Sequence, residues 1–208
     1  TDPKRVALLY GSAGVGKSVV MHDVLLKLEQ KEEYLVLGLK TDQIGFGDTE
    51  DLRKRMHLAK PLVTIIKEIA QKAKRVVVLI DQIDALSLSL SSNRTPLRSI
   101  FKLIEQIKSI PHVRVVISCR PYDLEYDPIL NDMKIETKWE LKNLSSGRVK
   151  RILKKYNLED SISEQLLAFL GNPLHLYLYL RVMPFGKLRN PITEEVLYDG
   201  LWRIFVID

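Results

Sequence analysis

The chain has 208 residues, enough for one domain and a smaller piece, and its hydrophobic fraction of 46% and charged fraction of 28% are those of an ordinary globular protein. We find no signal peptide and no apolar run long enough for a membrane span, and a single cysteine excludes an internal disulfide framework, so we expect a cytoplasmic protein. The net charge of +6 suits a protein that binds polyphosphate, and it permits weak nucleic-acid contact without requiring it.

The first predicted strand, Val6–Tyr10, leads into a loop that reads G-x-x-x-x-G-K-S over residues 11–18, the pattern of a Walker A phosphate-binding loop. Glycines allow backbone N–H groups to point inward at a β-phosphate, Lys17 can span the β- and γ-phosphates, and the Ser18 hydroxyl can bind Mg²⁺. Apolar residues then recur at helical spacing from Met21 to Leu28, so a helix is expected to direct its positive N-terminus at the phosphates. We therefore predict a nucleoside triphosphate site with Mg²⁺. The predicted nucleotide contacts in this segment are Gly11, Ser12, Ala13, Gly14, Val15, Gly16, Lys17, Ser18 and Val19.

Apolar strand patterns alternate with helical patterns as far as residue 141, which favours βαβ units and a parallel sheet. The predicted fold class is α/β, a three-layer P-loop NTPase of the ASCE type around a five-stranded parallel sheet. Residues 41–60 are polar and are expected to form a surface excursion, and a later helix is expected to begin with Thr95 as its N-cap. The predicted strands are Val6–Tyr10, Tyr34–Leu39, Val76–Ile80, Val113–Ser118 and Ile135–Leu141.

The third predicted strand ends in Asp81, which gives the Walker B pattern of aliphatic residues followed by an acid. An acid at the carboxyl end of a buried parallel strand is placed to hold Mg²⁺ through its water shell. Asp84, three residues on, could orient or deprotonate the attacking water, or it could be a helix N-cap or a solvated loop acid. Gln82 cannot act as a base, so hydrolysis is expected to depend on Asp84 and to be slow.

The fourth predicted strand ends in Ser118-Cys119-Arg120-Pro121. At that edge of the sheet the guanidinium of Arg120 could reach a γ-phosphate and distinguish a triphosphate from a diphosphate. The alternative is that Arg120 forms a salt bridge with Asp84 or Asp123.

After about Lys142 only helical patterns remain, and they predict a small helical lid. Its second helix has Ser161 and Glu164 at capping-box spacing, and its third helix starts at Pro173. The predicted domains are a nucleotide-binding domain over residues 1–143, the lid over 144–190, and the first helix of a truncated winged-helix domain over 191–208.

Together these motifs resemble the STAND class of signalling P-loop ATPases, which includes the NACHT and NB-ARC switches. The resemblance rests on the Walker A loop, Asp81-Gln82-Ile83-Asp84, Ser118-Cys119-Arg120-Pro121 and Gly171-Asn172-Pro173-Leu174, in that order. It implies that Arg120 senses the γ-phosphate and that Pro173 lies near the adenine and ribose. It implies an ATP/ADP switch that opens and forms a homo-oligomer after a trigger reaches a sensor domain, and that then activates an attached effector. Proteins of this class act in immunity, and we favour a role in prokaryotic antiviral defence.

Two departures from the family pattern stand out. Cys119 takes the place of the usual serine, and the winged-helix histidine that locks the ADP state is missing. His175 lies within the lid helix and is interpreted as structural, and the four histidines and one cysteine show no metal-ligand spacing.

Three alternatives stay open. A AAA+-like or archaeal-type ATPase acting on nucleic acid would share Walker A and B, although it would be expected to carry an acid at position 82. A nucleotide-gated scaffold would bind ATP and scarcely hydrolyse it. A GTPase is disfavoured because residues 39–42 do not supply a guanine-reading N/T-K-x-D motif. The predicted lid also contains an amphipathic helix with a basic face. We interpret this face as a solvated surface, with nucleic-acid contact as the alternative. Its cations are Arg148, Lys150, Arg151, Lys154 and Lys155.

Overall fold

The computed structural model describes residues 5–44, 47–87, 93–133, 135, 137–158, 162–183 and 193–203. The chain divides into two compact units, one formed by residues 1–12 and 17–141 and the other by residues 13–16 and 142–208. Each unit has its own buried apolar cluster.

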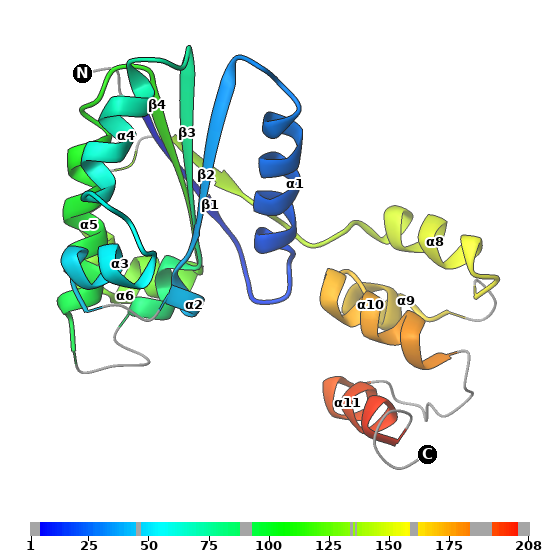
Figure 1. The fold of residues 1–208 in the computed structure, drawn as a ribbon. Coiled ribbons are helices and arrows are strands. Elements are labelled where there is room, and N and C mark those ends of the chain that lie inside the picture. The colour runs from blue at the N-terminus through cyan, green and yellow to red at the C-terminus, as the bar shows by residue number, and fades with distance from the viewer. Residues whose placement is uncertain are drawn as a thin grey trace. The chain divides into compact units, whose positions relative to one another are not determined.

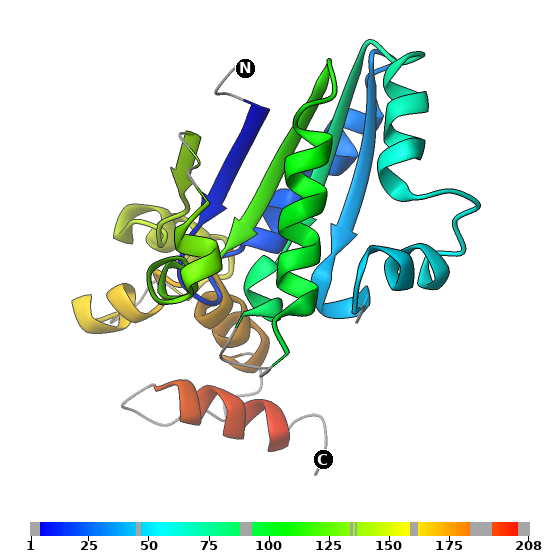
Figure 2. The ribbon, with the colours of Figure 1, turned by 90° about the vertical axis from the view of Figure 1, so that its left-hand side faces the viewer.

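The first unit is built on a five-stranded parallel sheet with the strand order β2-β3-β4-β1-β5 (Figure 2). Its strands are β1 (Val6–Tyr10), β2 (Tyr34–Lys40), β3 (Arg75–Asp81), β4 (Val113–Cys119) and β5 (Thr137–Glu140). Its helices are α1 (Lys17–Glu29), α2 (Thr41–Ile44), α3 (Thr49–Arg55), α4 (Leu62–Ala70), the 3₁₀ helix η2 (Ile83–Leu86), α5 (Thr95–Ile107), α6 (Pro121–Tyr126) and α7 (Pro128–Asn131). The predicted α/β fold with a five-stranded parallel sheet is confirmed.

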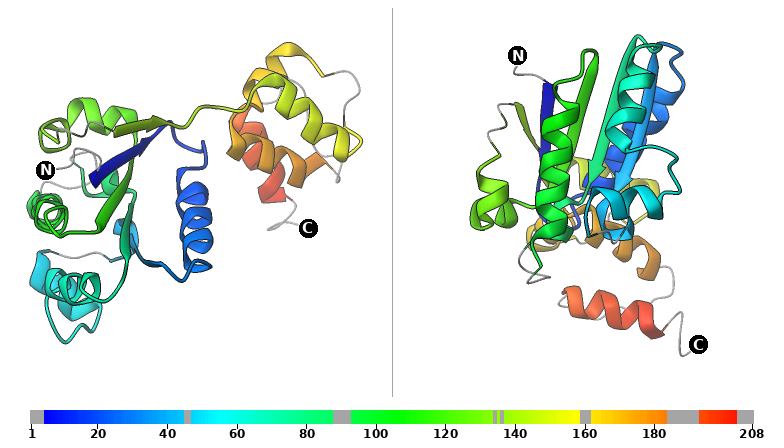
Figure 3. Two further views of the ribbon diagram at one scale, coloured as in Figure 1. Left: turned by 90° about the horizontal axis from the view of Figure 1, so that it is seen from above. Right: turned by 60° about the vertical axis from the view of Figure 1, so that its left-hand side comes forward.

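Helices cover both faces of this sheet, with α1 on one face and α4 and α5 on the other (Figures 1 and 3). The interior strand β3 is buried from Val76 to Asp81, as its unbroken apolar run predicts for a strand enclosed on both sides. On the α1 face, Met21 packs against Leu9, Val77 and Leu79. The opposite face holds the larger core, to which α5 contributes buried residues at helical spacing: Leu97, Ile100, Leu103, Ile104 and Ile107.

Several element boundaries differ from the sequence prediction. β5 covers Thr137–Glu140 rather than the predicted Ile135–Leu141, and it pairs with β1 at the edge of the sheet. Residues 41–60 are not a plain surface excursion, since Thr41 is 1% exposed and helices α2 and α3 lie in this stretch. Thr95 is the first residue of α5 rather than its cap, and the Asn93 side chain accepts a hydrogen bond from the Thr95 N–H.

The second unit is helical, with α8 (Ser146–Lys155), α9 (Glu164–Phe169), α10 (Pro173–Val182) and α11 (Glu194–Trp202). The side chain of Ser163 caps α9, whereas the predicted cap, Ser161, lies outside the described residues. The side chain of Thr193 caps α11. His175 stacks on Phe169, and its Nε2 lies 2.8 Å from a Glu194 carboxylate oxygen, contacts that agree with the structural role expected for it.

Residues 13–16 of the phosphate-binding loop group with this helical unit. The side-chain amide of Asn172 donates to the carbonyl of Ala13 at 3.0 Å, and the Leu174 N–H donates to the carbonyl of Gly14 at 3.2 Å. Asn172 also caps α10, since its Oδ1 accepts a hydrogen bond from the Leu174 N–H. Whether this unit is a lid followed by the start of a winged-helix domain stays a prediction. None of the helices in the described part of the chain is long and apolar enough to cross a membrane.

Candidate functional site

The phosphate-binding loop follows β1 and ends where α1 begins at Lys17. Gly14 and Gly16 have φ angles of +75° and +98°, a region that side chains rarely adopt, so the backbone favours glycine at these two positions. A Cβ at Gly14 would also lie 2.7 Å from Asn172 Oδ1, whereas a Cβ at Gly16 would meet nothing within 4 Å. Positive φ angles of this kind allow successive backbone N–H groups to point toward an anion.

Lys17 lies folded back over the loop. Its Nζ donates hydrogen bonds to the carbonyl oxygens of Gly11 at 2.7 Å and Ser12 at 3.0 Å. Burial lowers the pKa of Lys17, and the nearby Asp84 carboxylate opposes that fall. A phosphate oxygen would offer this buried ammonium a charged partner in place of two neutral carbonyls.

At the carboxyl end of β3, hydrogen bonds connect three neighbouring strands. The Ser118 hydroxyl, at the end of β4, donates to the Asp81 carboxylate and accepts from the Gln82 N–H at 2.8 Å. The Thr41 hydroxyl, directly after β2, contacts the backbone carbonyls of Asp81 and Gln82. Asp81 and Ser118 are buried, so this network fixes the Walker B carboxylate on the sheet.

Asp84 and Arg120 form an ion pair, with Arg120 Nε 3.0 Å from Asp84 Oδ2. This pairing was one of the two alternatives for Arg120, and it places the predicted sensor beside the predicted base. Asp84 is the second residue of η2 and is 5% exposed. Burial raises the pKa of its carboxyl, while the Arg120 guanidinium works in the opposite direction. The neighbouring thiol of Cys119 is buried and its pKa is raised by that burial, which makes it unreactive.

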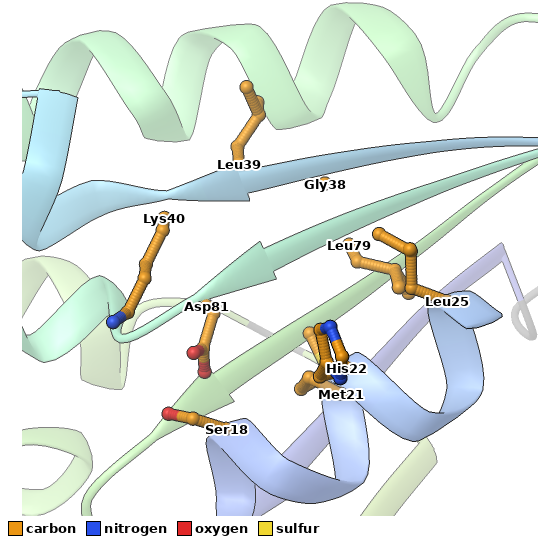
Figure 4. A pocket seen from close by; sticks show the side chains of 9 residues that line it. All are labelled: Ser18, Met21, His22, Leu25, Gly38, Leu39, Lys40, Leu79 and Asp81. Carbon is orange, nitrogen blue, oxygen red and sulfur yellow. The ribbon is translucent and has the colours of Figure 1, made fainter.

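Ser18 and Asp81 line the same cavity, whose volume is about 240 Å³ (Figure 4). Figure 4 shows the Asp81 carboxylate directed toward the side of the cavity on which Ser18 lies. A hydroxyl and a carboxylate are hard oxygen donors, and two protein ligands with several retained waters are what Mg²⁺ prefers, so these residues fit that ion. Within the described ranges, no group of three or more His, Cys, Asp or Glu is placed to hold a metal by itself.

The first unit thus contains Lys17, Ser18, Asp81, Asp84 and Arg120, while residues 13–16 and Pro173 belong to the second unit. Pro173 is the first residue of α10, and its predicted contact with adenine and ribose stays a prediction. The side chain of Val19 is 72% exposed on α1. Sequence reasoning missed Thr41, because its hydroxyl meets residues 40 and 41 positions away along the chain and no local pattern marks such a contact.

Residues 7–142 match the sequence model of the ATPase family associated with various cellular activities (AAA). None of the curated proteins matches the chain by sequence. The fold is similar to the Aeropyrum pernix ORC2 protein in its ADP form, with a TM-score of 0.54 and 12% identity over 95% of this chain and 62% of that one. It is also similar to a chain of the E. coli MS115-1 HORMA:CdnC:Trip13 complex, with a TM-score of 0.58 and 15% identity over 95% of this chain and 73% of that one. At these identities the likeness shows the fold alone, and this chain spans less than two thirds of the ORC2 protein.

Proposed function

The chain belongs to the AAA family of nucleotide-binding ATPases, and we propose that it is a slow ATP/ADP switch of the STAND class rather than a fast motor. The observation that carries the proposal is the residue directly after the Walker B aspartate. Gln82 stands there, and its amide donates to the Ser18 hydroxyl at 3.1 Å instead of offering a carboxylate to a water molecule. An amide has no proton-accepting strength comparable with that of a carboxylate, so proton removal falls to another residue.

Asp84 is the proposed base, and its ion pair with Arg120 weakens it as a proton acceptor. A carboxylate whose charge is neutralised by a guanidinium at 3.0 Å is a poor proton acceptor. Arg120 has a side chain that is 57% exposed, so it can move toward a γ-phosphate, which offers a stronger, doubly charged partner. In this scheme the triphosphate releases Asp84, which then accepts the proton of the attacking water.

Discrimination between ATP and ADP follows from the same contact. A switch moves only by the difference in ligand affinity between its two states, and a γ-phosphate contact with Arg120 is available to ATP alone. Lys17 would bind the phosphates, and Ser18 and Asp81 would hold Mg²⁺, which neutralises phosphate charge when it is bound. We further propose that the ATP-bound chain opens, forms a homo-oligomer and activates an attached effector in defence. This part of the proposal depends on the resemblance to STAND proteins.

The test combines three measurements on the purified chain: affinity for fluorescent ATP and ADP analogues, single-turnover hydrolysis, and particle mass in each nucleotide. We expect binding of both nucleotides, a turnover far below the roughly 1–1000 s⁻¹ of ordinary enzymes, and a larger assembly only with ATP. Turnover within that ordinary range, with one mass in both nucleotides, would reject the switch. Tight ATP binding with no hydrolysis over hours and no change in mass would favour the nucleotide-gated scaffold.

A second candidate, an ATPase that acts on nucleic acid, is favoured by one surface of the second unit. All five cations of α8 lie on its exposed side, while Val149 and Leu153 are buried on the other side. Lys150 Nζ lies 3.3 Å from a carboxylate oxygen of Glu164. Binding to duplex DNA whose affinity falls steeply with salt, and which Arg151→Glu with Lys154→Glu abolishes, would support this candidate. Binding that neither salt nor the charge reversal changes would leave α8 as a solvated surface.

A further inference from the structure

Gln82 has a backbone conformation that few residues other than glycine adopt. Its φ and ψ angles are +59° and +48°, in the left-handed region, at the turn between β3 and η2. For a residue with a side chain, this left-handed conformation raises the free energy of the folded chain by on the order of one kcal/mol. Gly, Asn or Asp is the usual residue in such a turn. The presence of glutamine here therefore calls for a contact that its longer side chain makes.

Hydrogen bonds to both the N–H and the carbonyl of Gln82 stabilise this conformation. Ser118 Oγ accepts the Gln82 N–H at 2.8 Å, and the Thr41 hydroxyl contacts the Gln82 carbonyl. Both hydroxyl residues are almost fully buried, at 0% and 1% exposure. The turn thus points the side chain of Gln82 in a fixed direction.

That direction leads to α1. Gln82 Nε2 donates to Ser18 Oγ at 3.1 Å, a contact between residues 64 positions apart in the chain. Ser18 is the second residue of α1 and lines the cavity that Asp81 also lines (Figure 4). A hydroxyl oxygen that accepts one hydrogen bond retains a second lone pair, so it can still bind a cation.

We infer that Gln82 is a positioning residue that orients the Ser18 hydroxyl for the metal that accompanies the nucleotide. The inference rests on the proposed function, in which Ser18 and Asp81 hold Mg²⁺. An amide suits this role because it donates a hydrogen bond to the Ser18 hydroxyl oxygen, whereas an ionised carboxylate at the same place could only accept one. Gln82 thus increases Mg²⁺ affinity without itself contacting the ion.

The experiment measures the Mg²⁺ concentration that gives half-maximal tightening of fluorescent ATP binding, and separately the affinity for ATP in EDTA. Gln82→Leu removes the amide at similar length. Gln82→Asn keeps an amide and prefers the left-handed region, but it is one methylene too short to reach Ser18. Gln106→Leu, on the exposed side of α5, is the matched control. A double-mutant cycle adds Ser18→Ala alone and combined with Gln82→Leu.

We expect both Gln82 variants to raise the half-maximal Mg²⁺ concentration about five- to tenfold, the loss typical of one hydrogen bond. The affinity for ATP in EDTA should stay unchanged, and Gln82→Leu should have no further effect in the Ser18→Ala chain. Gln82→Asn should melt at the same temperature as the parent or higher, which separates the effect from misfolding. An unchanged Mg²⁺ requirement in both variants, or equal additive losses with and without the Ser18 hydroxyl, would overturn the inference. A parent chain that binds no ATP would instead reject the proposed function.

Discussion

Arg120 and Asp84 form an ion pair between an exposed guanidinium and a buried carboxylate. Arg120 Nε lies 3.0 Å from Asp84 Oδ2, yet the side chain of Arg120 is 57% exposed and that of Asp84 only 6%. The other carboxylate oxygen, Oδ1, is buried and has no hydrogen-bond partner among the residues that the structure describes. A buried carboxylate with one vacant acceptor and one movable partner is poised to accept a proton once that partner leaves.

Asp84→Asn should therefore slow single-turnover ATP hydrolysis about 10²- to 10⁴-fold, because a general base contributes on that scale. The affinity for ATP should change little, since Asp84 contacts no phosphate in the proposed scheme. Rapid mixing of excess protein with labelled ATP measures the chemical step directly. Asp123→Asn is the nearby control. A variant that hydrolyses ATP as fast as the parent would show that Asp84 is not the base.

Arg120→Ala should keep its affinity for ADP and lose its preference for ATP. The reason is that the proposed guanidinium contact involves only the γ-phosphate, which ADP lacks. Charge-assisted hydrogen bonds contribute about 1.5–3 kcal/mol, so we expect ATP affinity to fall about 10- to 100-fold. Isothermal calorimetry with both nucleotides provides the comparison, and Arg98→Ala on the exposed side of α5 is the control. Equal weakening for ATP and ADP would contradict the sensor role.

The raised pKa of Asp84 has a measurable effect on stability. Burial disfavours the ionised carboxylate in the folded chain, so the folded state holds this proton more tightly than the unfolded state does. The contribution of Asp84 to the free energy of unfolding consequently falls as the pH rises from the unfolded pKa through the raised folded pKa. Asparagine does not ionise, so the stability of Asp84→Asn relative to the parent should increase as the pH rises from 4 to 8. Urea unfolding at several pH values, with the exposed Asp23→Asn as control, measures this difference.

Loss of the ion pair should not cancel that gain. The guanidinium of Arg120 is largely hydrated, and exposed ion pairs contribute little to stability. A difference between variant and parent that stays constant from pH 4 to pH 8 would show that the burial of Asp84 does not disfavour its charge.

The strands and the phosphate-binding loop could be predicted because local patterns encode them. The apolar run before Asp81 predicted β3 to within one residue at each end, and Gly14 and Gly16 have the backbone angles that the Walker A pattern demands. The Walker B network could not be predicted. Thr41 and Ser118 reach Asp81 through hydrogen bonds between separate strands, and only the strand order β2-β3-β4 brings them together. The sequence also could not decide between an ion pair and a γ-phosphate contact for Arg120, because the charge of an arginine does not indicate which anion it binds.

Gly14→Ala should impair nucleotide binding through the loop backbone. At φ +75° an alanine is strained by about 1–2 kcal/mol, and its Cβ would also lie 2.7 Å from Asn172 Oδ1 and 2.9 Å from Leu174 Cβ. The affinity for ADP and ATP should therefore fall together, by tenfold or more. Combining Gly14→Ala with Asn172→Ala separates the two causes: partial recovery identifies the steric contact, and no recovery identifies the backbone angle alone. Unchanged nucleotide affinity in Gly14→Ala would mean that this loop does not bind the phosphates.

Gln82→Glu should convert the slow site into a faster one. The turn that holds Gln82 would place the new carboxylate beside Ser18 and Asp81, where it could accept a proton without waiting for Arg120 to release Asp84. A general base contributes about 10²- to 10⁴-fold, so single-turnover hydrolysis should rise by about two orders of magnitude or more after the Mg²⁺ requirement has been saturated. The same substitution in an Asp84→Asn chain tests the route, because activity restored there must come from the new carboxylate. Hydrolysis that stays at the parent rate in Gln82→Glu at saturating Mg²⁺ would show that the amide at position 82 is not what limits turnover.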